Sequence, residues 1–474
     1  MKRLVVVMAV LLAVLLLFGA TTGRADDGAT VTVLDHVIPV PGFTNFADPA
    51  NSHGASFDIS FVDSDRYYIA DRGWATGFDP GRVDVFDAVK DVYLYSISGW
   101  VGSKGSAGGP TATTLGPNGI LVLHTHKDDP GELWGADGIP SGGGPSTVKV
   151  ADLGTKSIVD SISTGGSQRC DELSYDPIHR VIMVANDADT PPFVTFISQN
   201  QFSGGHHKVL GKIIYDGGCT SPPCVSGSPP SQKGHGPNAA PGGSPGLEQS
   251  VFDAPYFYFS VPSTVDKPDG EIDVIDPVSM NIVKRFDAPG CNPAGLALGP
   301  DHHLVLGCGG QLTLVIDDQT GTPFPTVKQV GGVDEVWYNK GDNRYYLAAN
   351  ACTTAECIAV SPVAFGPGQH PALGVIDAKT NLWVENLATG QSAHSVAVNP
   401  TNNHIFVPLT IPVASGSPTV PPILQWKGQT TPPWLGLGIA VFEHVKGEEE
   451  CDRDRACEEF CRGGDRDHKE WDRR

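Results

Sequence analysis

The stretch GQSAHSVAVNPTNNHIFVPLTI, residues 390–411, predicts two short β-strands joined by a tight turn. The strand residues, 395–398 and 404–407, are mostly β-branched or aromatic, which favours strands. The intervening residues 399–403, Asn-Pro-Thr-Asn-Asn, are typical of turns. A single hairpin of this kind is uninformative, but near-copies of it recur along the chain.

The repeats predict an all-β fold. Including the stretch above, seven hairpins of one pattern lie at residues 57–70, 112–124, 172–185, 249–260, 295–307, 335–348 and 395–407. Most are followed by a second strand pair that opens on a run ending in Asp, such as EIDVID or LGVID. Four antiparallel strands repeated at a period above about 40 residues are typical of a β-propeller. The sequence therefore predicts a seven-bladed β-propeller of four-stranded antiparallel blades, in which the N-terminal strand 30–40 supplies the last strand of blade seven.

The residues also support a resemblance to a known repeat. The run GEIDVIDPVSMNIVKRFDAPGCNPAGLALGPDHHLVLG, residues 270–307, resembles the YVTN-type repeat of secreted propellers, in which G-x-V-x-V-I-D leads to P-x-G-x-A-x-x-P. Residues 373–409 match a second time. The resemblance to YVTN/NHL-type seven-bladed propellers covers residues 30–445 and is strongest in blades four to seven. It implies the fold rather than a function, because such propellers bind, scaffold or catalyse.

The ends of the chain predict export. Lys2 and Arg3 precede the apolar run 4–18, and small residues follow, so residues 1–25 are expected to be a signal peptide. The apolar run is shorter than a membrane span and no second span follows, so no transmembrane anchor is expected. Residues 26–446 would form the propeller. Residues 447–474 would be a charged, Cys-containing tail that is mostly disordered. The expected location is extracellular or periplasmic.

The ten cysteines fit an oxidising compartment. Their spacing suggests three local pairs, Cys219 with Cys224, Cys291 with Cys308, and Cys352 with Cys357. Cys170 stands alone in the body of the chain. Its pairing with one of the tail cysteines stays open.

The formal net charge of −21 excludes classes of partner. Binding to nucleic acid needs clustered Lys and Arg, so no nucleic-acid partner is expected. Cations and neutral or basic partners remain open. The chain is expected to be a monomer.

Aligning the hairpins on their turns predicts a ring of polar residues. The position five residues before each turn lies at the start of the innermost strand, near one mouth of the central channel, and is occupied in blade order by Asp58, Thr111, Asp171, Glu248, Ala294, Asp334 and His394. Converging carboxylates repel one another unless cations, hydrogen bonds or water relieve the repulsion. Asp, Glu and His also ligate Ca²⁺ or a transition metal. The predicted ligands of a divalent cation are Asp58, Asp171, Glu248, Asp334 and His394.

Two alternatives stay open at this ring. The acids could accept backbone N–H bonds or face channel water, with no ion bound. A register slip of one residue would turn Glu172 and Glu335 toward the channel instead.

Long insertions predict that the same mouth is the binding face. A protein, peptide or carbohydrate ligand is expected there, because Trp74, Trp134, Trp426 and Trp434 fall in or next to these insertions and exposed aromatic rings stack on such ligands. The polar set His124, His126, Asp128, Asp129 and Glu132 is placed on this face as a weaker metal candidate. His206 and His207 are expected to be surface residues on the opposite mouth.

These features favour a secreted binding or scaffolding propeller that uses the loop-rich mouth, with a cation ordering it. The alternative is a metal-dependent propeller enzyme of the lactonase or polysaccharide-lyase type, in which His394 would be the general base or a ligand. No GxSxG elbow in strand–turn–helix context and no Walker A, HExxH or CxxCH motif is present to favour another chemistry.

Overall fold

The structure is a computed structural model. It describes residues 30–40, 56–73, 80–102, 114–125, 129–140, 142–200, 205–215, 231–233, 246–264, 267–361, 364, 368–390, 393–409 and 438–446. The predicted signal peptide 1–25, the tail 447–474 and the Cys219–Cys224 pair lie outside these residues. The chain divides into two compact units, Leu34–Glu443 and a smaller one made of Met1–Val33 with His444–Arg474. In the smaller unit, Thr32 Oγ1 lies 3.1 Å from His444 Nδ1.

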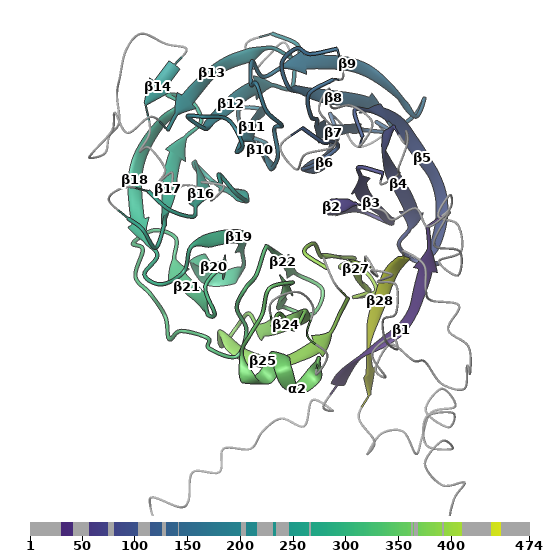
Figure 1. Ribbon diagram of the computed structural model, residues 1–474, viewed down its shortest axis with the longest axis vertical. Helices are drawn as coiled ribbons and strands as arrows, with labels where there is room; N and C mark the ends of the chain where they lie inside the picture. Colours follow the sequence, from purple (N-terminus) through teal and green to yellow (C-terminus); the bar gives the residue numbers. More distant parts are fainter. Residues whose placement is uncertain are drawn as a thin grey trace, which may run out of the picture. The chain divides into compact units, whose positions relative to one another are not determined.

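The larger unit is a ring of seven β-sheets, which confirms the predicted propeller (Figure 1). Blades one to four are β2 (Phe57–Asp63), β3 (Arg66–Asp71), β4 (Gly81–Asp87) and β5 (Val92–Trp100); β6 (Ile120–Leu123), β7 (Glu132–Ala136), β8 (Thr147–Asp152) and β9 (Ser157–Ser163); β10 (Leu173–Asp176), β11 (Val181–Asn186), β12 (Phe193–Ser198), β13 (Val209–Ile214) and the parallel β14 (Ser231–Lys233); and β15 (Ser250–Asp253), β16 (Tyr256–Val261), β17 (Glu271–Asp276) and β18 (Asn281–Asp287).

Blades five to seven complete the ring. They are β19 (Pro293–Leu298), β20 (His303–Cys308) and β21 (Thr313–Asp317); β22 (Glu335–Asn339), β23 (Arg344–Ala349), β24 (Ala372–Asp377) and β25 (Leu382–Ala388); and β26 (Ala397–Val398), β27 (Ile405–Leu409), β28 (Gly438–Lys446) and β1 (Thr30–Pro39). In blade five, two isolated bridges, Thr313 with Val327 and Ile316 with Pro323, stand where a fourth strand would pair.

The N-terminal strand is the outer strand of blade seven, as predicted. Its sheet has the order β1-β28-β27-β26, so the first strand of the chain pairs with the last. This pairing covers the outer edge of β28, which would otherwise expose unpaired backbone groups.

The hairpin predicted at 112–124 in blade two is wrong. The first strand there is β6, and it pairs with β7, with Ile120 opposite Gly135 and Leu123 opposite Glu132. The residues Gly116-Pro117-Asn118-Gly119 form a bend before the inner strand and not a turn within the hairpin. Gly, Pro and Asn mark bends of both kinds, so the sequence alone could not separate them.

Apolar contacts between neighbouring blades form the core. Tyr67 of β3 stacks on Phe406 of β27 with ring centroids 4.8 Å apart, joining blades one and seven. Tyr215, next to β13, packs against Phe259 of β16 at 6.2 Å, joining blades three and four. All four side chains are fully buried. Both faces of each blade are covered by its neighbours in this way. The connections at the ends of the strands therefore provide most of the surface that can bind a partner.

The Asp that ends the third strand of most blades folds the following turn. In β24, Asp377 Oδ1 accepts hydrogen bonds from Thr380 N at 2.8 Å and Thr380 Oγ1 at 2.7 Å. Asn381 then takes a positive φ of 57°, which Asn tolerates better than most residues. The same turn follows Asp87, Asp152, Asp276 and Asp317. The recurring run that ends in Asp is therefore a turn signal as well as a strand signal.

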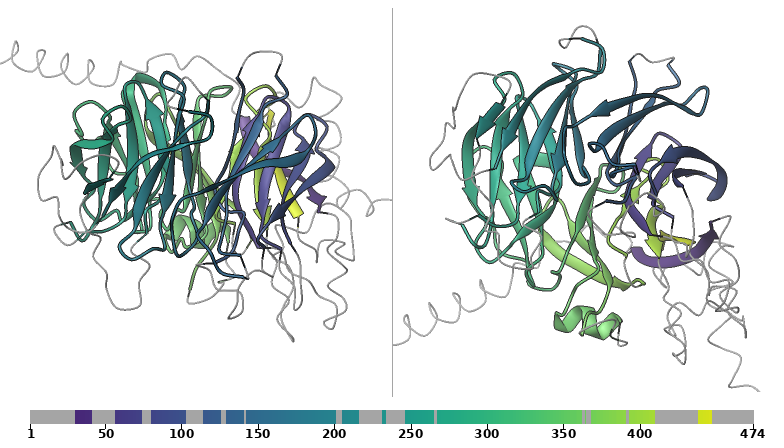
Figure 2. Two further views of the ribbon diagram at one scale, coloured as in Figure 1. Left: turned by 90° about the horizontal axis from the view of Figure 1, so that it is seen from above. Right: turned by 45° about the horizontal axis from the view of Figure 1, so that its top comes forward.

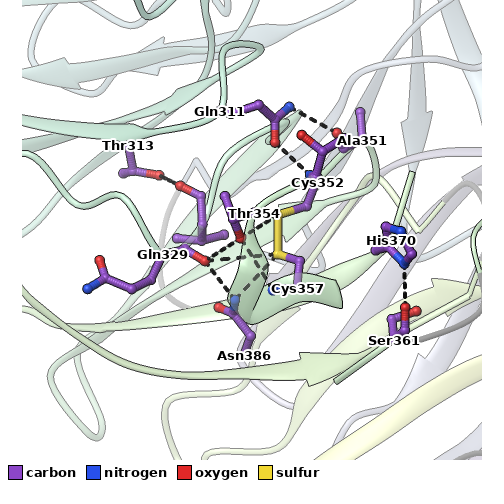
Figure 3. The surroundings of a disulfide bond; sticks show 12 residues. Gln311, Thr313, Gln329, Ala351, Cys352, Thr354, Cys357, Ser361, His370 and Asn386 are labelled. Carbon is purple, nitrogen blue, oxygen red and sulfur yellow. Dashed lines mark hydrogen bonds between the residues drawn. A yellow bond between two sulfur atoms is a disulfide. The ribbon is translucent and has the colours of Figure 1, made fainter. Parts of the chain in front are cut away.

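Two predicted disulfides are present, Cys291–Cys308 and Cys352–Cys357. The second encloses the start of the short helix α2 (Ala355–Val360) and fixes it against blade six (Figure 3). Thr354 caps this helix and donates to Gln329 O at 2.8 Å, and Asn386 Nδ2 donates to the same carbonyl at 2.8 Å. Cys170 is buried and free. None of the helices in the described part of the chain is long and apolar enough to cross a membrane.

The strands of the larger unit run along the axis of the ring, so their connections gather at two mouths (Figure 2). One mouth carries the connections that lead from strand two to strand three and from blade to blade. The other carries the short turns within the hairpins, such as Asp63–Arg66 and Asp253–Tyr256. The described connections follow the predicted separation, except that residues 124–131, predicted at the first mouth, connect β6 to β7 at the second.

Replacing Asp377 by Ala should destabilise the protein by about 1–2 kcal/mol, because the Thr380 N–H and hydroxyl lose their acceptor. Urea unfolding followed by tryptophan fluorescence measures the change. Asp287→Ala is the matched control, since it removes only an exposed ion pair with Lys267 and should change stability by less than about 0.5 kcal/mol. Equal effects of the two substitutions would contradict the role of the Asp turn.

Candidate functional site

The predicted ring residues lie together at the mouth with the long connections. Asp171 N, Glu248 N and Asp334 N each donate to a carbonyl of the second strand of their own blade, at 2.8, 3.1 and 3.0 Å. This shared bond holds each residue at the start of an inner strand. Asp58 lies in β2, and His394 precedes β26. We call the assembly that they form with the residues named below the channel-mouth cluster.

Asn118 occupies the blade-two position that the sequence assigned to Thr111. Its N–H donates to Ala136 O at 2.9 Å, which is the same bond that Asp171, Glu248 and Asp334 make. Thr111 lies outside the described residues. The error follows from the misplaced hairpin of blade two, since counting back from the wrong turn gives the wrong residue.

Arg72 and Asp58 together join three blades at the cluster. Its guanidinium contacts the Asp58 carboxylate of its own blade, and its Nε donates to Asn118 Oδ1 of blade two at 2.8 Å. On the other side, His394 Nε2 of blade seven lies 3.1 Å from Asp58 Oδ1. Asp58 is thus held between two cationic groups. Burial favours its neutral form, but Arg72 and His394 outweigh burial and lower the pKa of Asp58.

Arg169 is the second cation of the cluster. Its Nη2 lies 2.6 Å from Asp171 Oδ2 and 2.8 Å from Asp187 Oδ2. These carboxylates outweigh burial and raise the pKa of Arg169 further above its usual value. A buried guanidinium between two carboxylates is a fixed positive charge that no pH within the range of folded proteins removes.

Sequence reasoning missed both arginines and Asp187. Arg72 and Asp187 each follow directly on the second strand of their blade, β3 and β11. That position faces the ring residue across the hairpin, so a second alignment at the end of strand two would have found them. Arg169 lies two residues before Asp171 and offered only its proximity as a signal.

In most of the other carboxyl groups, and in Asp171 despite its ion pair with Arg169, burial raises the pKa. Burial, then Asp334 and Asp171, raise the pKa of Glu248 well above its usual value. Burial and the Glu335 carboxylate do the same to Glu172. Burial also raises the pKa of Asp334. Burial raises the pKa of Asp171 to about 7, with Arg169 opposing the shift. The cluster therefore favours protonated carboxyl groups near neutral pH.

The two alternative registers turn out to belong to one cluster. Glu172 and Glu335 are buried, yet they interact electrostatically with Asp58 and Asp334, which belong to the other register. Glu335 Oε2 also accepts a hydrogen bond from Val396 N of blade seven at 3.3 Å. Glu335 thus binds a neighbouring blade, whereas Glu172 lines the channel.

The surroundings of His394 favour its charged form. Burial lowers its pKa, but the hydrogen bond to Asp58 and the charge of Asp334 prevail and raise it. An imidazole whose pKa is raised is a poorer base at neutral pH and a better positive charge or acid. Its geometry therefore suits charge pairing more than proton abstraction.

Behind the cluster lies the central channel, a cavity of about 470 Å³ lined by the inner strands of blades one to six. Serines and Gln249 line it near the cluster, and aromatic side chains line it further along. Phe61 and Trp337 meet edge to face, with ring centroids 5.6 Å apart. The channel therefore passes from a charged mouth to an apolar, aromatic wall.

Three other sequence expectations need correction. Trp134 is fully buried in β7 and donates to Glu132 Oε2 at 3.0 Å, so it is no exposed platform. His124 belongs to the β6–β7 turn at the opposite mouth, where Nε2 lies 2.9 Å from Asp63 Oδ2. His207 is not a surface residue. The side chains of Trp134 and His207 are covered by neighbouring strands. The sequence of a single repeat does not show which residues of other strands will cover it. The remaining tryptophans Trp74, Trp426 and Trp434, with His126 and Asp128, lie outside the described residues.

In the described part of the chain, three metal-ligating side chains gather within 4.8 Å at one place, Asp253, His302 and Asp318. None of them was predicted from the sequence. The cation predicted at Asp58, Asp171, Glu248, Asp334 and His394 remains a prediction.

No protein-family model matches the sequence, and no curated protein matches it. Among solved structures, the chain is similar to one from a crystal structure of the mitotic checkpoint complex. The two share 12% sequence identity at a TM-score of 0.48, over 82% of this chain and 93% of the other. The function must therefore be argued from the chain's own residues.

The cluster predicts that stability falls as the pH rises from about 5 to about 8. Asp171, Glu172 and Glu248 have raised pKa values, so the folded protein keeps protons that the unfolded chain releases. The raised pKa of His394 acts in the same direction, because its contribution is present below its ordinary pKa and is lost as the pH rises through the folded value. The lowered pKa of Asp58 acts only at more acid pH.

Melting temperatures at constant ionic strength across this range measure the effect. Glu248→Gln, which keeps the shape and removes the titration, should flatten the profile. Asp65→Asn, at an exposed turn of the opposite mouth, should leave it unchanged. A wild-type melting temperature that is constant or rises with pH would refute the electrostatic account of the cluster.

Proposed function

We propose that this protein is a secreted binding or scaffolding propeller that holds a protein or peptide at its loop-rich channel mouth. A basic side chain of the partner enters the channel-mouth cluster. The proposal is a non-catalytic one, and the charge balance of the cluster carries it.

Carboxyl groups outnumber cationic groups in the cluster, and a bound cation would favour the ionised forms of these acids. Arg72, Arg169 and His394 are its cationic groups, and they face seven carboxyl groups, Asp58, Asp171, Glu172, Asp187, Glu248, Asp334 and Glu335. Asp171 Oδ1 and Asp187 Oδ1 are buried and accept no hydrogen bond from the described residues. Buried acceptors without a donor are costly, so N–H bonds from a ligand would relieve them, while its positive charge would lie nearer Glu248 and Asp334.

The channel behind the cluster favours a Lys or Arg side chain over a bare ion. Such a side chain has a charged head and an aliphatic stem, and the stem can lie along apolar surface while the head pairs with carboxylates. Along the channel, the charged mouth is followed by serines and then by the aromatic wall. This order suits the charged head and the aliphatic stem of a Lys or Arg side chain. The net charge of −21 would favour approach of a basic partner.

Secretion is supported by the disulfides. Cys291–Cys308 and Cys352–Cys357 both form at residues where they hold connections at the cluster's mouth. Disulfides persist in oxidising compartments, which agrees with the predicted signal peptide at residues 1–25.

The enzymatic alternative, a metal-dependent lactonase or polysaccharide lyase acting through His394, has weaker support. Its general base would have to be unprotonated near neutral pH, whereas Asp58 and Asp334 raise the pKa of His394. Asp58, the nearest carboxylate, is already paired with Arg72. Both groups that the mechanism needs are therefore engaged in ion pairs.

Selection of a phage-displayed random peptide library on the immobilised full chain tests the proposal. Enriched peptides should carry Lys or Arg, and Glu248→Gln or Asp334→Asn should weaken their binding by more than tenfold. Asp65→Asn, an exposed acid at the opposite mouth, is the control and should leave binding unchanged.

Two outcomes would overturn the proposal. One is enrichment of peptides without basic residues, or of none, while glycan arrays give binding that depends on the cluster. The other is peptide binding that disappears with a chelator and returns with Ca²⁺, which would assign a metal ion and not a basic side chain to the cluster.

A further inference from the structure

A second group of polar residues lies at the opposite mouth, between blades four and five. Asp253 is the last residue of β15 in blade four. His302 ends the 3-10 helix η3 (Pro300–His302), which connects β19 to β20 in blade five. Asp318 directly follows β21 of the same blade. Three chain segments far apart in sequence thus meet at one interblade seam.

The ligand atoms of these residues converge. His302 Nδ1 lies 3.1 Å from Asp318 Oδ1 and 3.9 Å from Asp253 Oδ2, and all three ligand atoms lie within 4.8 Å of one another. Ligands bound to one cation at about 2.0 to 2.2 Å stand about 3 to 4 Å from each other. Small side-chain movements would therefore bring all three onto one ion.

Asp318 provides an independent reason to expect a ligand. Its side chain is fully buried, and apart from the contact of Oδ1 with His302 Nδ1, neither carboxylate oxygen has a hydrogen-bond partner in the described part of the chain. A buried carboxylate without donors is unfavourable unless it is protonated or bound to a cation. The facing carboxylate of Asp253 adds repulsion, which a cation between the two would remove.

The backbone holds His302 over Asp318. Asp301 and His302 take positive φ values of 55° and 63° in succession, which is uncommon for residues other than glycine. Asp318 N donates to His302 O at 3.0 Å and fixes the turn to the end of β21. The outer part of the imidazole stays half exposed, so an ion at Nδ1 could be reached from solvent and could keep water ligands.

Gln319 adds a polar side chain next to the imidazole. Its amide nitrogen lies 3.3 Å from Nδ1 and 3.1 Å from Nε2 of His302. The oxygen and nitrogen of a side-chain amide are interchangeable by rotation, so the same position can present a carbonyl oxygen. A fourth protein ligand is therefore within reach.

We propose that Asp253, His302 and Asp318 bind a divalent transition-metal cation of the Zn²⁺ type, which joins blades four and five. The ligand set selects this class of ion. An imidazole nitrogen with two carboxylates suits Zn²⁺, whereas Ca²⁺ prefers oxygen ligands only. The proposal does not depend on the channel-mouth cluster, which lies at the other mouth of the ring.

Metal titration of the full chain after dialysis against a chelator tests the proposal. Zn²⁺ should bind with a stoichiometry of one at this site by calorimetry and raise the melting temperature, and Co²⁺ should give a visible absorption band. His302→Asn removes the imidazole with a residue that tolerates positive φ, and it should weaken binding by more than tenfold, as should Asp253→Asn.

Asp301→Asn is the matched control. It removes one negative charge, as Asp253→Asn does, and lies in the turn of His302. Because it removes no proposed ligand, Zn²⁺ binding should persist. Asp318→Asn adds a second readout, since it should raise the melting temperature of the metal-free protein while abolishing the rise that Zn²⁺ produces.

The proposal is overturned if Zn²⁺ and Co²⁺ do not bind, or if His302→Asn binds them as the wild type does. The latter result would assign the metal to another histidine, such as His124 or His206. Stabilisation by Asp318→Asn without any metal response would show that Asp253 and Asp318 share a proton instead.

Discussion

The inner strands of the ring converge on one axis, and this convergence brings the residues at their starts into each other's electric fields. Asp58 and His394 are 336 residues apart in sequence, yet they lie in hydrogen-bonding contact. In a buried, low-dielectric site, unpaired carboxylates oppose closure of the ring. Arg72 and Arg169 each bind carboxylates there, and Arg72 spans blades one and two, so the two arginines make the closed ring compatible with its acids. Removing one partner of such a buried pair typically costs about 3 to 5 kcal/mol.

The same contacts limit what the cluster can bind. Two guanidinium groups in the centre of the cluster repel a cation that approaches Asp58 or Asp171, because these are the carboxylates that they already hold. Glu248 and Asp334 are less covered and have no arginine partner among the described residues. A positively charged ligand would therefore be bound on the side of blades four and six, away from Arg72.

The sequence predicted the scaffold because the information for it is local. Strand alternation, the turn after each strand-ending Asp, and the missing partner of β28 can each be read from a few neighbouring residues. The five ring positions were also predictable, since hairpins with similar turns place equivalent residues at equal distances from the turn. Blade two shows the limit of this reasoning, because Gly116-Pro117 imitated a hairpin turn and displaced the count from Asn118 to Thr111. Arg72, Arg169 and the triad with His302 could not be predicted from single repeats, because their contacts cross between blades.

At both mouths, protonation favours the folded state. At one mouth the protonated groups are neutral carboxyl groups, and at the other they are charged histidines. At the channel-mouth cluster, burial and like charges make carboxyl groups prefer the neutral form. At the opposite mouth, histidines of one blade contact carboxylates of the next, in the pairs His124–Asp63, His207–Asp160 and His404–Asp91. These carboxylates, together with Glu132 beside His207, raise the pKa values of the three histidines, against burial. The contribution of the histidines to stability is present below their ordinary pKa and is lost as the pH rises through the raised values. The pH dependence of stability therefore has the same sign at both mouths, and the two contributions add. The fold is expected to be more stable in mildly acid than in alkaline solution.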